Sequence, residues 1–259
     1  LYHPEHLFLI HVDKKSGNHV HSPLHAWVKT HPNAFALSRR RTWWGGISFV
    51  ETLLAAIDFL QTHKEWDYLI NLSGQDFPLV PTEHVAHQLQ QSAGLNWMEC
   101  RPIHEIWSNP EFRLNRYHIQ IPGTNYIKRI PMLNRPVRPP STLYGGSSYL
   151  ILHRTFCHWV SSKADIQPYL DYFRYTFIPE EMFFQTLIMA SPFSQQVRND
   201  SKRYVDWNRG PEFPRILLQE DWPRLHLSSA FWARKFDCRV DNKILSILEK
   251  RLKTLSQKT

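Results

Sequence analysis

Cysteines are few in this chain, and no pattern would pair them. Cys100, Cys157 and Cys238 are the only three among 259 residues, and no two of them form a CxxC motif. Three widely spaced thiols cannot build a disulfide framework, which argues against a small disulfide-stabilised secreted domain. The sequence therefore predicts a protein of a reducing compartment.

Long hydrophobic runs are also missing. No apolar stretch approaches the roughly 18 residues of a membrane-spanning helix, and the first residues form no signal-peptide pattern. We therefore expect no transmembrane segment and a cytoplasmic location, with peripheral association with a membrane as a further option.

The common signatures of phosphate and metal binding are missing too. There is no GxxxxGK[ST], no GxGxxG after a strand, no HExxH and no cluster of Cys and His, although the chain has 15 histidines. Asp-x-Asp, the spacing with which many sugar-nucleotide enzymes hold a divalent cation, does not occur either. We expect no metal and no other cofactor, so protein cations would have to neutralise any bound diphosphate.

Positive charge and aromatic side chains are present in excess. The formal net charge is +8, aromatic residues make up 14% of the chain, and hydrophobic residues make up 42%, as in a globular protein. The charge suits a polyanion such as nucleic acid or a membrane surface, and it suits a diphosphate pocket equally well. Basic and aromatic residues also line grooves for single-stranded nucleic acid, so a basic module of that kind stays open as an alternative.

Short apolar runs alternate with helical patterns, which predicts strand–helix–strand units with a parallel sheet in one α/β domain spanning residues 1–259. Segment 101–145 is rich in Pro and Arg, has no sustained period, and is predicted to be a long functional excursion over the surface. Strands are expected at 7–12 (buried), 35–38, 68–72, 96–100 and 147–152, and helices at 47–60, 82–91, 153–162 and 179–190, with a last helix carrying Ile244, Ile247, Leu248 and Leu252 on one face.

Three acidic residues lie at the ends of predicted strands. Asp13 follows the first strand, Asp76 follows the strand at 68–72, and Glu99 ends the strand at 96–100. Ligands of open α/β sheets bind beyond the carboxyl ends of strands, so these acids are candidates for a binding site. Each of them could equally be an ordinary turn or cap residue.

Glu180 and Glu181 stand directly after Pro179 and before an apolar run, in "IPEEMFF". Proline in the first turn and acids beside the positive end of a helix are what helix physics favours, so both could be structural. The alternative is that one of them is a catalytic carboxylate.

Candidate ligand-binding cations and aromatics lie elsewhere in the chain. Arg215 could contact phosphate oxygens in a bidentate manner, and Lys235 could neutralise a departing pyrophosphate, whereas Arg234 is predicted to be a solvated surface charge. Trp44 could stack on a base or a sugar. The arginines at 39–41 are predicted to form an exposed basic edge.

Seven motifs in order resemble one family: "HVDKKS", "WWGGISFVETLLAAI", "WDYLINLSGQDFPL", "GGSSYLILHRTF", "IPEEMFFQTLI", "KRYVDW" and "SSAFWARKFD". The chain resembles peptide O-xylosyltransferases and core-2/I-branching β-1,6-N-acetylglucosaminyltransferases (glycosyltransferase family 14), and its bacterial members most. The resemblance runs from about residue 5 to residue 240. It places the family's first strand and helix before Leu1, so a catalytically inactive carbohydrate-binding relative is a second alternative.

The resemblance implies a GT-A-type glycosyltransferase with a Rossmann-like mixed sheet flanked by helices. Such an enzyme would transfer xylose or N-acetylglucosamine from a UDP-sugar to a glycan, peptide or other hydroxyl acceptor, with inversion and without a metal. Glu181 matches the family's catalytic base, and Glu180 would remain a helix-start charge. The other implied site residues are Asp13, Trp44, Ser147, Arg215 and Lys235 for the UDP donor, and Asp76, Glu99, Asp206 and Trp207 for the acceptor or the sugar.

Overall fold

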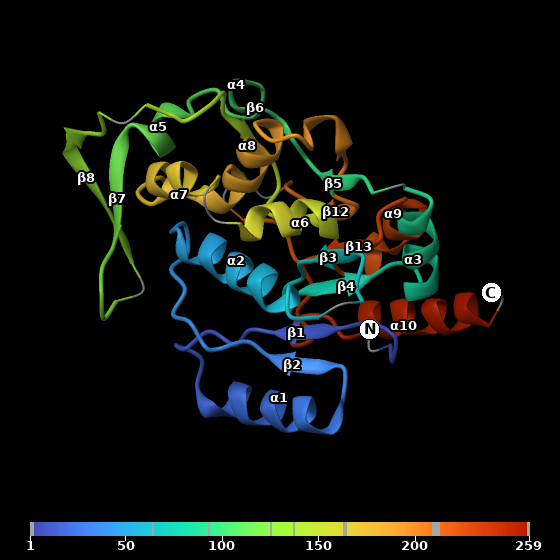
Figure 1. The fold of residues 1–259 in the computed structure, drawn as a ribbon. Coiled ribbons are helices and arrows are strands. Elements are labelled where there is room, and N and C mark those ends of the chain that lie inside the picture. Colours follow the sequence, from blue (N-terminus) through green and yellow to red (C-terminus); the bar gives the residue numbers. More distant parts are fainter. Residues whose placement is uncertain are drawn as a thin grey trace.

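The computed structural model describes residues 3–63, 65–92, 94–124, 126–136, 138–162, 165–208 and 213–257. Helices pack around several small sheets, as Figure 1 shows, so the predicted α/β class is confirmed. The described helices are α1 (Asn18–Thr30), α2 (Ser48–Leu60), α3 (Thr82–Gln90), α4 (Ile103–Ile106), α5 (Glu111–Leu114), α6 (Arg154–Ser161), α7 (Gln167–Phe173), α8 (Phe183–Met189), α9 (Trp222–Leu227), α10 (Lys243–Ser256) and the 3-10 helices η1 (Pro179–Glu181), η2 (Ser194–Gln196) and η3 (Gln219–Asp221).

The sheets are mixed rather than wholly parallel. A four-stranded sheet has the order β11 (Val197–Asn199), β5 (Asn96–Met98), β10 (Ile151–His153) and β3 (Tyr68–Ile70), with β10 antiparallel to both of its neighbours. The mixed sheet that the resemblance implies is therefore confirmed, and the parallel arrangement suggested by the strand–helix pattern does not extend to β10, which follows the long excursion and enters the sheet from the opposite end. A second sheet joins β12 (Arg203–Val205), β13 (Trp232–Arg234) and β4 (Asp76–Pro78).

The first two strands form a separate parallel pair, β1 (Phe8–Ile10) and β2 (Ala34–Ala36). All three residues of β1 are half-buried, whereas the sequence predicted a buried strand at 7–12. The reason is that β2 is the one strand paired with β1 in the described part of the chain. Helix α2 covers both regions, since Phe59 contacts Phe35 of β2 with ring centroids 5.4 Å apart, and Ile57 packs in the main core with Leu69 of β3.

Helices with long apolar stripes form where the sequence predicts them. Helix α2 buries Val50, Ile57 and Leu60, and α10 buries Ile244 and Leu248. The helix predicted at 179–190 is interrupted, because the 3-10 turn η1 precedes α8 and Met182 between them has non-helical dihedral angles.

Segment 101–145 is more ordered than its sequence indicates. It contains α4, α5, the short pair β6 (Arg101–Pro102) and β9 (Tyr144–Gly145), and the antiparallel hairpin of β7 (Arg116–Gln120) and β8 (Ile127–Asn134). The hairpin lies at the left edge of the molecule in Figure 1, beside α5 and α7. The predicted excursion over the surface is thus a folded segment with its own helices and strands.

Candidate active site

Glu181 lies at the end of η1, in a partly enclosed position. Its Oε2 accepts a hydrogen bond of 2.7 Å from Nη1 of Arg113, whose guanidinium stacks on the Trp107 ring at 4.0 Å. Burial raises the pKa of Glu181, and the charge of Glu99 raises it further, whereas Arg113 works in the opposite direction. A carboxylate whose pKa is moved towards neutrality, and which is held in place by an arginine, has the properties of a general base.

The neighbouring Glu180 is not a solvated charge. It opens the 3-10 turn as predicted, but its Oε2 is buried with no hydrogen-bond partner among the described residues. Burial raises the pKa of Glu180 to about 8, and the adjacent Glu181 adds to the effect. Glu180 thus lies in the first turn as predicted, but its Oε2 is turned away from solvent and its raised pKa favours the protonated form near neutral pH.

Two consecutive glycines bring Glu99 and Glu181 together. The amide of Gly146 donates to the Glu181 carbonyl at 2.9 Å. A Cβ at Gly146 would lie 1.9 Å from the Glu99 carbonyl oxygen, and one at Gly145 would lie 2.6 Å from the Trp107 ring. No other residue fits between these groups, so the pair fixes the distance between the two acidic segments. The Glu99 carboxylate, 39% exposed, pairs with Arg101 at 2.9 Å.

The chain that follows the glycines connects the acids to a group of cations. The Ser147 carbonyl accepts a hydrogen bond of 2.8 Å from Nε2 of Gln185 in α8, so it is tied to the element that follows Glu181. Two residues later, the Tyr149 ring lies under the guanidinium groups of Arg203, at 4.8 Å, and Arg234, at 4.6 Å. Segment 145–149 thus contacts the backbones of Glu99 and Glu181 at its glycines and the two arginines at Tyr149.

The cation group consists of Arg203 and Arg234 beside a single carboxylate, Asp76. Asp76 Oδ1 lies 3.8 Å from Nε of Arg203 and 3.7 Å from Nε of Arg234. Neither Nε, nor Nη1 of Arg203, has a hydrogen-bond partner among the described residues. Burial lowers the pKa of Arg203 to about 10. Two arginines and one aspartate leave one positive charge uncompensated. The three N–H groups without a partner could donate to an anion.

Two predictions change at this cluster. Arg234 is not a surface charge, because its side chain is 17% exposed and stacks on Tyr149. Asp76 closes a turn after β3, since its amide donates to the Ser73 carbonyl at 3.1 Å, but it is more than a turn residue. It is the first residue of β4, its side chain is 1% exposed, and its Oδ2 accepts a 2.5 Å hydrogen bond from the Ser73 amide. Its charge therefore serves to hold the arginines rather than to meet solvent.

Arg215 is already engaged by two carboxylates. Its Nη2 lies 2.8 Å from Asp206 Oδ2 and also pairs with Asp221, and its Nε donates to the same Asp206 oxygen at 3.2 Å. The Asp206 and Asp221 side chains are 3% and 2% exposed. The Asn208 amide and Arg215 lower the pKa of Asp206. The predicted phosphate contact by Arg215 would require the displacement of two buried carboxylates, so the structure assigns Arg215 and Asp206 to holding the fold.

Trp44 is exposed to solvent and Lys235 is partly exposed. Trp44 is 52% exposed and lies between Phe177, at 5.5 Å, and Phe213, at 6.0 Å. Phe177 precedes the turn that carries Glu181, so the exposed indole borders the acidic side of the site. Lys235 is half-buried directly after Arg234, as the sequence predicted. Trp207 is 49% exposed beside the buried Asp206.

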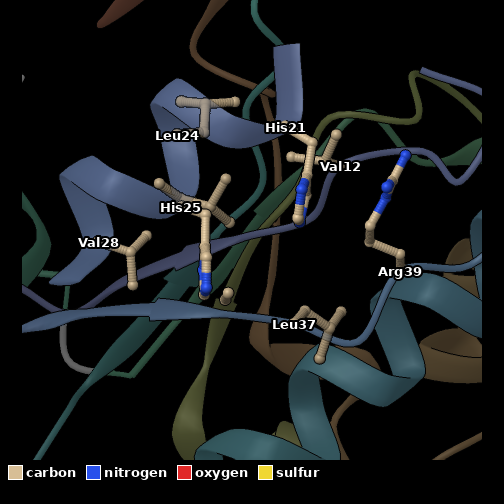
Figure 2. A pocket seen from close by; sticks show the side chains of 9 residues that line it. Val12, His21, Leu24, His25, Val28, Leu37 and Arg39 are labelled. Carbon is tan, nitrogen blue, oxygen red and sulfur yellow. The ribbon is translucent and has the colours of Figure 1, made fainter. Parts of the chain in front are cut away.

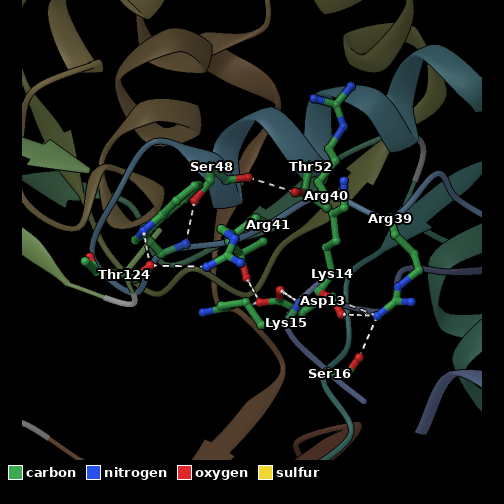
Figure 3. Close-up of polar contacts among 12 residues, drawn as sticks. Asp13, Lys14, Lys15, Ser16, Arg39, Arg40, Arg41, Ser48, Thr52 and Thr124 are labelled. Atoms are coloured by element: carbon green, nitrogen blue, oxygen red, sulfur yellow. Dashed lines mark hydrogen bonds and ion pairs between the residues drawn. The ribbon is translucent and has the colours of Figure 1, made fainter. Parts of the chain in front are cut away.

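Asp13 anchors a compact turn after β1, shown in Figure 3. Its carboxylate accepts hydrogen bonds from the Thr42 hydroxyl and, at 2.8 Å, from the Lys15 amide. Burial alone would raise the pKa of Asp13, but these hydrogen bonds and the Lys15 charge lower it overall. Arg39 donates to the carbonyls of the same turn, including that of Ser16 at 2.6 Å, so residues 39–41 are not simply an exposed basic edge.

A small apolar hollow lies between α1 and the β1–β2 pair, beside this turn (Figure 2). Of the predicted site residues, none lines it. Among the described residues there is also no group of three or more His, Cys, Asp or Glu side chains that could hold a metal ion. No helix in the described part of the chain is long and apolar enough to cross a bilayer.

Mixed sheets with flanking helices are consistent with the class of GT-A-like glycosyltransferases. A family model described as Core-2/I-Branching enzyme matches residues 1–222, and the chain belongs to this family. The predicted family is thereby confirmed.

Similar proteins include a Xylosyltransferase of Ciona intestinalis, 29% identical over 97% of this chain and 31% of the relative. Xylosyltransferase 1 of Rattus norvegicus is 26% identical over 97% of this chain and 33% of the relative. Xylosyltransferase oxt of Drosophila melanogaster is 28% identical over 97% of this chain and 31% of the relative. This chain spans about a third of the length of these animal relatives, and its predicted affiliation with bacterial members stays a prediction.

Proposed function

We propose that the chain is an inverting, metal-independent glycosyltransferase that moves xylose or N-acetylglucosamine from a UDP-sugar to an acceptor hydroxyl. One observation carries this proposal: segment 145–149 contacts the backbone of Glu181 at Gly146 and the guanidinium groups of Arg203 and Arg234 at Tyr149. A transfer reaction of this kind needs a base at the acceptor and positive charge at the leaving diphosphate.

Glu181 is the proposed base. It would take the proton of the acceptor hydroxyl while that oxygen attacks the anomeric carbon from the face opposite the departing UDP, which inverts the configuration. Arg113 stabilises the ionised carboxylate and fixes its orientation through the 2.7 Å hydrogen bond. Glu99, brought close by the glycine pair, is proposed to contact acceptor hydroxyls.

Lys235, next to Arg234, is the proposed source of charge for the leaving UDP. Negative charge develops on the diphosphate in the transition state, where fixed cations stabilise it more than they stabilise the bound donor. Arg234 and Arg203 have free N–H donors and a net positive balance with Asp76. Arg215, in contrast, is neutralised by Asp206 and Asp221. We therefore propose that Arg234 and Lys235, and not Arg215, contact the diphosphate.

Trp44, Ser147 and Asp13 are proposed for the donor side, and Trp207 for the sugar or the acceptor. The exposed indole of Trp44 offers a flat face to a base or a sugar ring. Asp13 has its carboxylate held by Thr42 and the Lys15 amide, so it is pre-oriented for a hydrogen-bonded ligand.

The decisive experiment is a donor screen. UDP-xylose and UDP-N-acetylglucosamine would be compared for binding by calorimetry and for slow hydrolysis, each in the presence of EDTA. Binding of UDP-sugars with turnover of one of them supports the proposal. Glycan binding without turnover of any donor would identify an inactive carbohydrate-binding relative, and binding of single-stranded oligonucleotides in preference to UDP would identify a nucleic-acid-binding module.

A further inference from the structure

The excess positive charge of the chain is concentrated in one segment. Residues 112–164 contain eight Lys or Arg and no Asp or Glu, which equals the formal net charge of +8 for the whole protein. The hairpin of β7 and β8, here called the arm, lies inside this segment. The proposed transfer reaction uses no residue of the arm.

The inner face of the arm is anchored to the body of the molecule. His118 stacks on Phe177 at 5.1 Å. A Cβ at Gly46 would lie 2.8 Å from Cδ1 of Ile127, so the Ile127 side chain packs directly on the Gly46 backbone. At the turn, the Thr124 carbonyl accepts a hydrogen bond of 2.9 Å from Trp43 Nε1, which Figure 3 also draws. The arm is therefore a fixed feature of the surface rather than a loose loop.

The outer side of the arm exposes apolar side chains beside cations. Successive side chains of a strand point to opposite faces, so Ile119 faces away from the inward His118, and its cross-strand partner is the exposed Lys128. Residues 131–133 have no partner on β7, because the register shifts between Arg116 and Tyr117. The exposed fractions along the arm are 97% for Met132, 75% for Tyr126, 55% for Leu133 and 39% for Ile119.

We propose that the arm docks the protein on the surface of an anionic lipid bilayer. Lipid phosphates would pair with cations such as Lys128, and the acyl boundary would receive Met132 and Leu133. Tyrosine favours the interface between headgroups and acyl chains, which suits Tyr126. A nucleic acid or an acidic protein would satisfy the charge, but a phosphate backbone gives aliphatic side chains nothing to bury against. The combination of aliphatic residues and cations therefore favours the bilayer.

Vesicle sedimentation with the 259-residue chain tests this proposal. The wild type should bind vesicles that contain phosphatidylglycerol and should bind pure phosphatidylcholine vesicles far less. Lys128→Glu should weaken binding about 10-fold or more. Each cation near an anionic surface contributes to the binding free energy, and this change replaces a cation with an anion. The double variant Met132→Ser with Leu133→Ser should weaken it by about 10-fold or more through the lost apolar insertion.

Matched controls lie elsewhere on the surface. Leu227 of α9 is 84% exposed and Lys253 of α10 is also exposed, so Leu227→Ser and Lys253→Glu repeat the same chemical changes away from the arm. Both controls should bind vesicles like the wild type. The proposal is overturned if the wild type does not bind anionic vesicles, if arm and control variants lose binding equally, or if the arm variants bind like the wild type. Arm-dependent binding of a single-stranded oligonucleotide or of polyglutamate, with no vesicle binding, would also overturn it in favour of those partners.

Discussion

The buried Glu180 should make the stability of the protein depend on pH, and Glu180→Gln should remove that dependence. The folded-state pKa is about 8 against an ordinary value of 4.5. A carboxyl with a raised pKa holds its proton more tightly when folded than when unfolded. Its contribution is complete below the unfolded pKa and is lost as the pH rises from about 4.5 towards 8. The linkage relation gives a loss of about 3–6 kcal/mol over that window.

Urea unfolding of the wild type and of Glu180→Gln at about pH 5 and about pH 9 measures this effect. Gln mimics the neutral acid, so the variant should be more stable than the wild type at the higher pH and similar to it at the lower pH. Comparison of the two proteins cancels the contributions of the histidines, of which His118 and His153 have pKa values lowered by burial. An identical pH dependence in both proteins would show that the pKa of Glu180 is not raised in the folded protein, which would contradict this reasoning.

Activity separates the two acids further. Glu181→Gln keeps the size of the base but cannot accept a proton, so transfer should fall by at least ~100-fold at every pH. UDP affinity should be retained, since the base faces the acceptor. Glu180→Gln should keep near-normal turnover at neutral pH and should stay active above pH 8, where ionised Glu180 in the wild type competes with Glu181 for Arg113. If Glu180→Gln is inactive and Glu181→Gln remains active, then Glu180 is the catalytic base.

Four further predictions test the rest of the site. Calorimetry should give the same UDP affinity with and without EDTA, and a loss of binding on chelation would contradict the metal-free proposal. Gly146→Ala should lower the free energy of unfolding by about 3 kcal/mol or more, because its Cβ would lie 1.9 Å from a carbonyl oxygen, whereas Gly74→Ala, with nothing within 4 Å, serves as the control. Arg215→Ala should cost about 3–5 kcal/mol of stability, because the buried Asp221 loses its arginine and Asp206 keeps only the 3.7 Å contact with Arg224. Lys235→Ala should leave stability intact and lower kcat/KM by about 10- to 1000-fold, and wild-type rates in it would make the lysine a surface charge.

The parts of the fold that the sequence predicts correctly are those with a strong hydrophobic period. Helix α2 has an apolar stripe that packs in the core, and α10 buries one face. Helix α1 was not predicted, because it contains Pro23 and buries no residue, so no apolar stripe marks it. The hairpin of β7 and β8 was also missed. Its strands are mostly exposed, and a strand that buries little carries little alternation.

The candidate site shows the same division. Glu181 could be identified because a proline, two acids and an apolar run are adjacent in the chain. Its partner Arg113 lies 68 residues earlier in a segment with no motif, so only the fold brings them together. Arg203 stood in the quoted motif "KRYVDW" without an assigned role. An arginine between residues with β propensity was the one available sign that its charge would be buried in a strand.

The balance of buried charge is the feature that sequence reasoning could least supply. Arg215 and Arg234 lie in the same basic stretch, and each could have been the phosphate ligand or the structural cation. Among the described residues, Arg215 pairs with two carboxylates, whereas Arg203 and Arg234 share one, that of Asp76. A cation between two buried acids gains nothing from a diphosphate, since that ligand would repel both carboxylates. Two cations around one acid gain from any anion that reaches their free N–H groups. The number of carboxylates around each arginine, which depends on residues distant in the chain, therefore decides which of them can stabilise a leaving group.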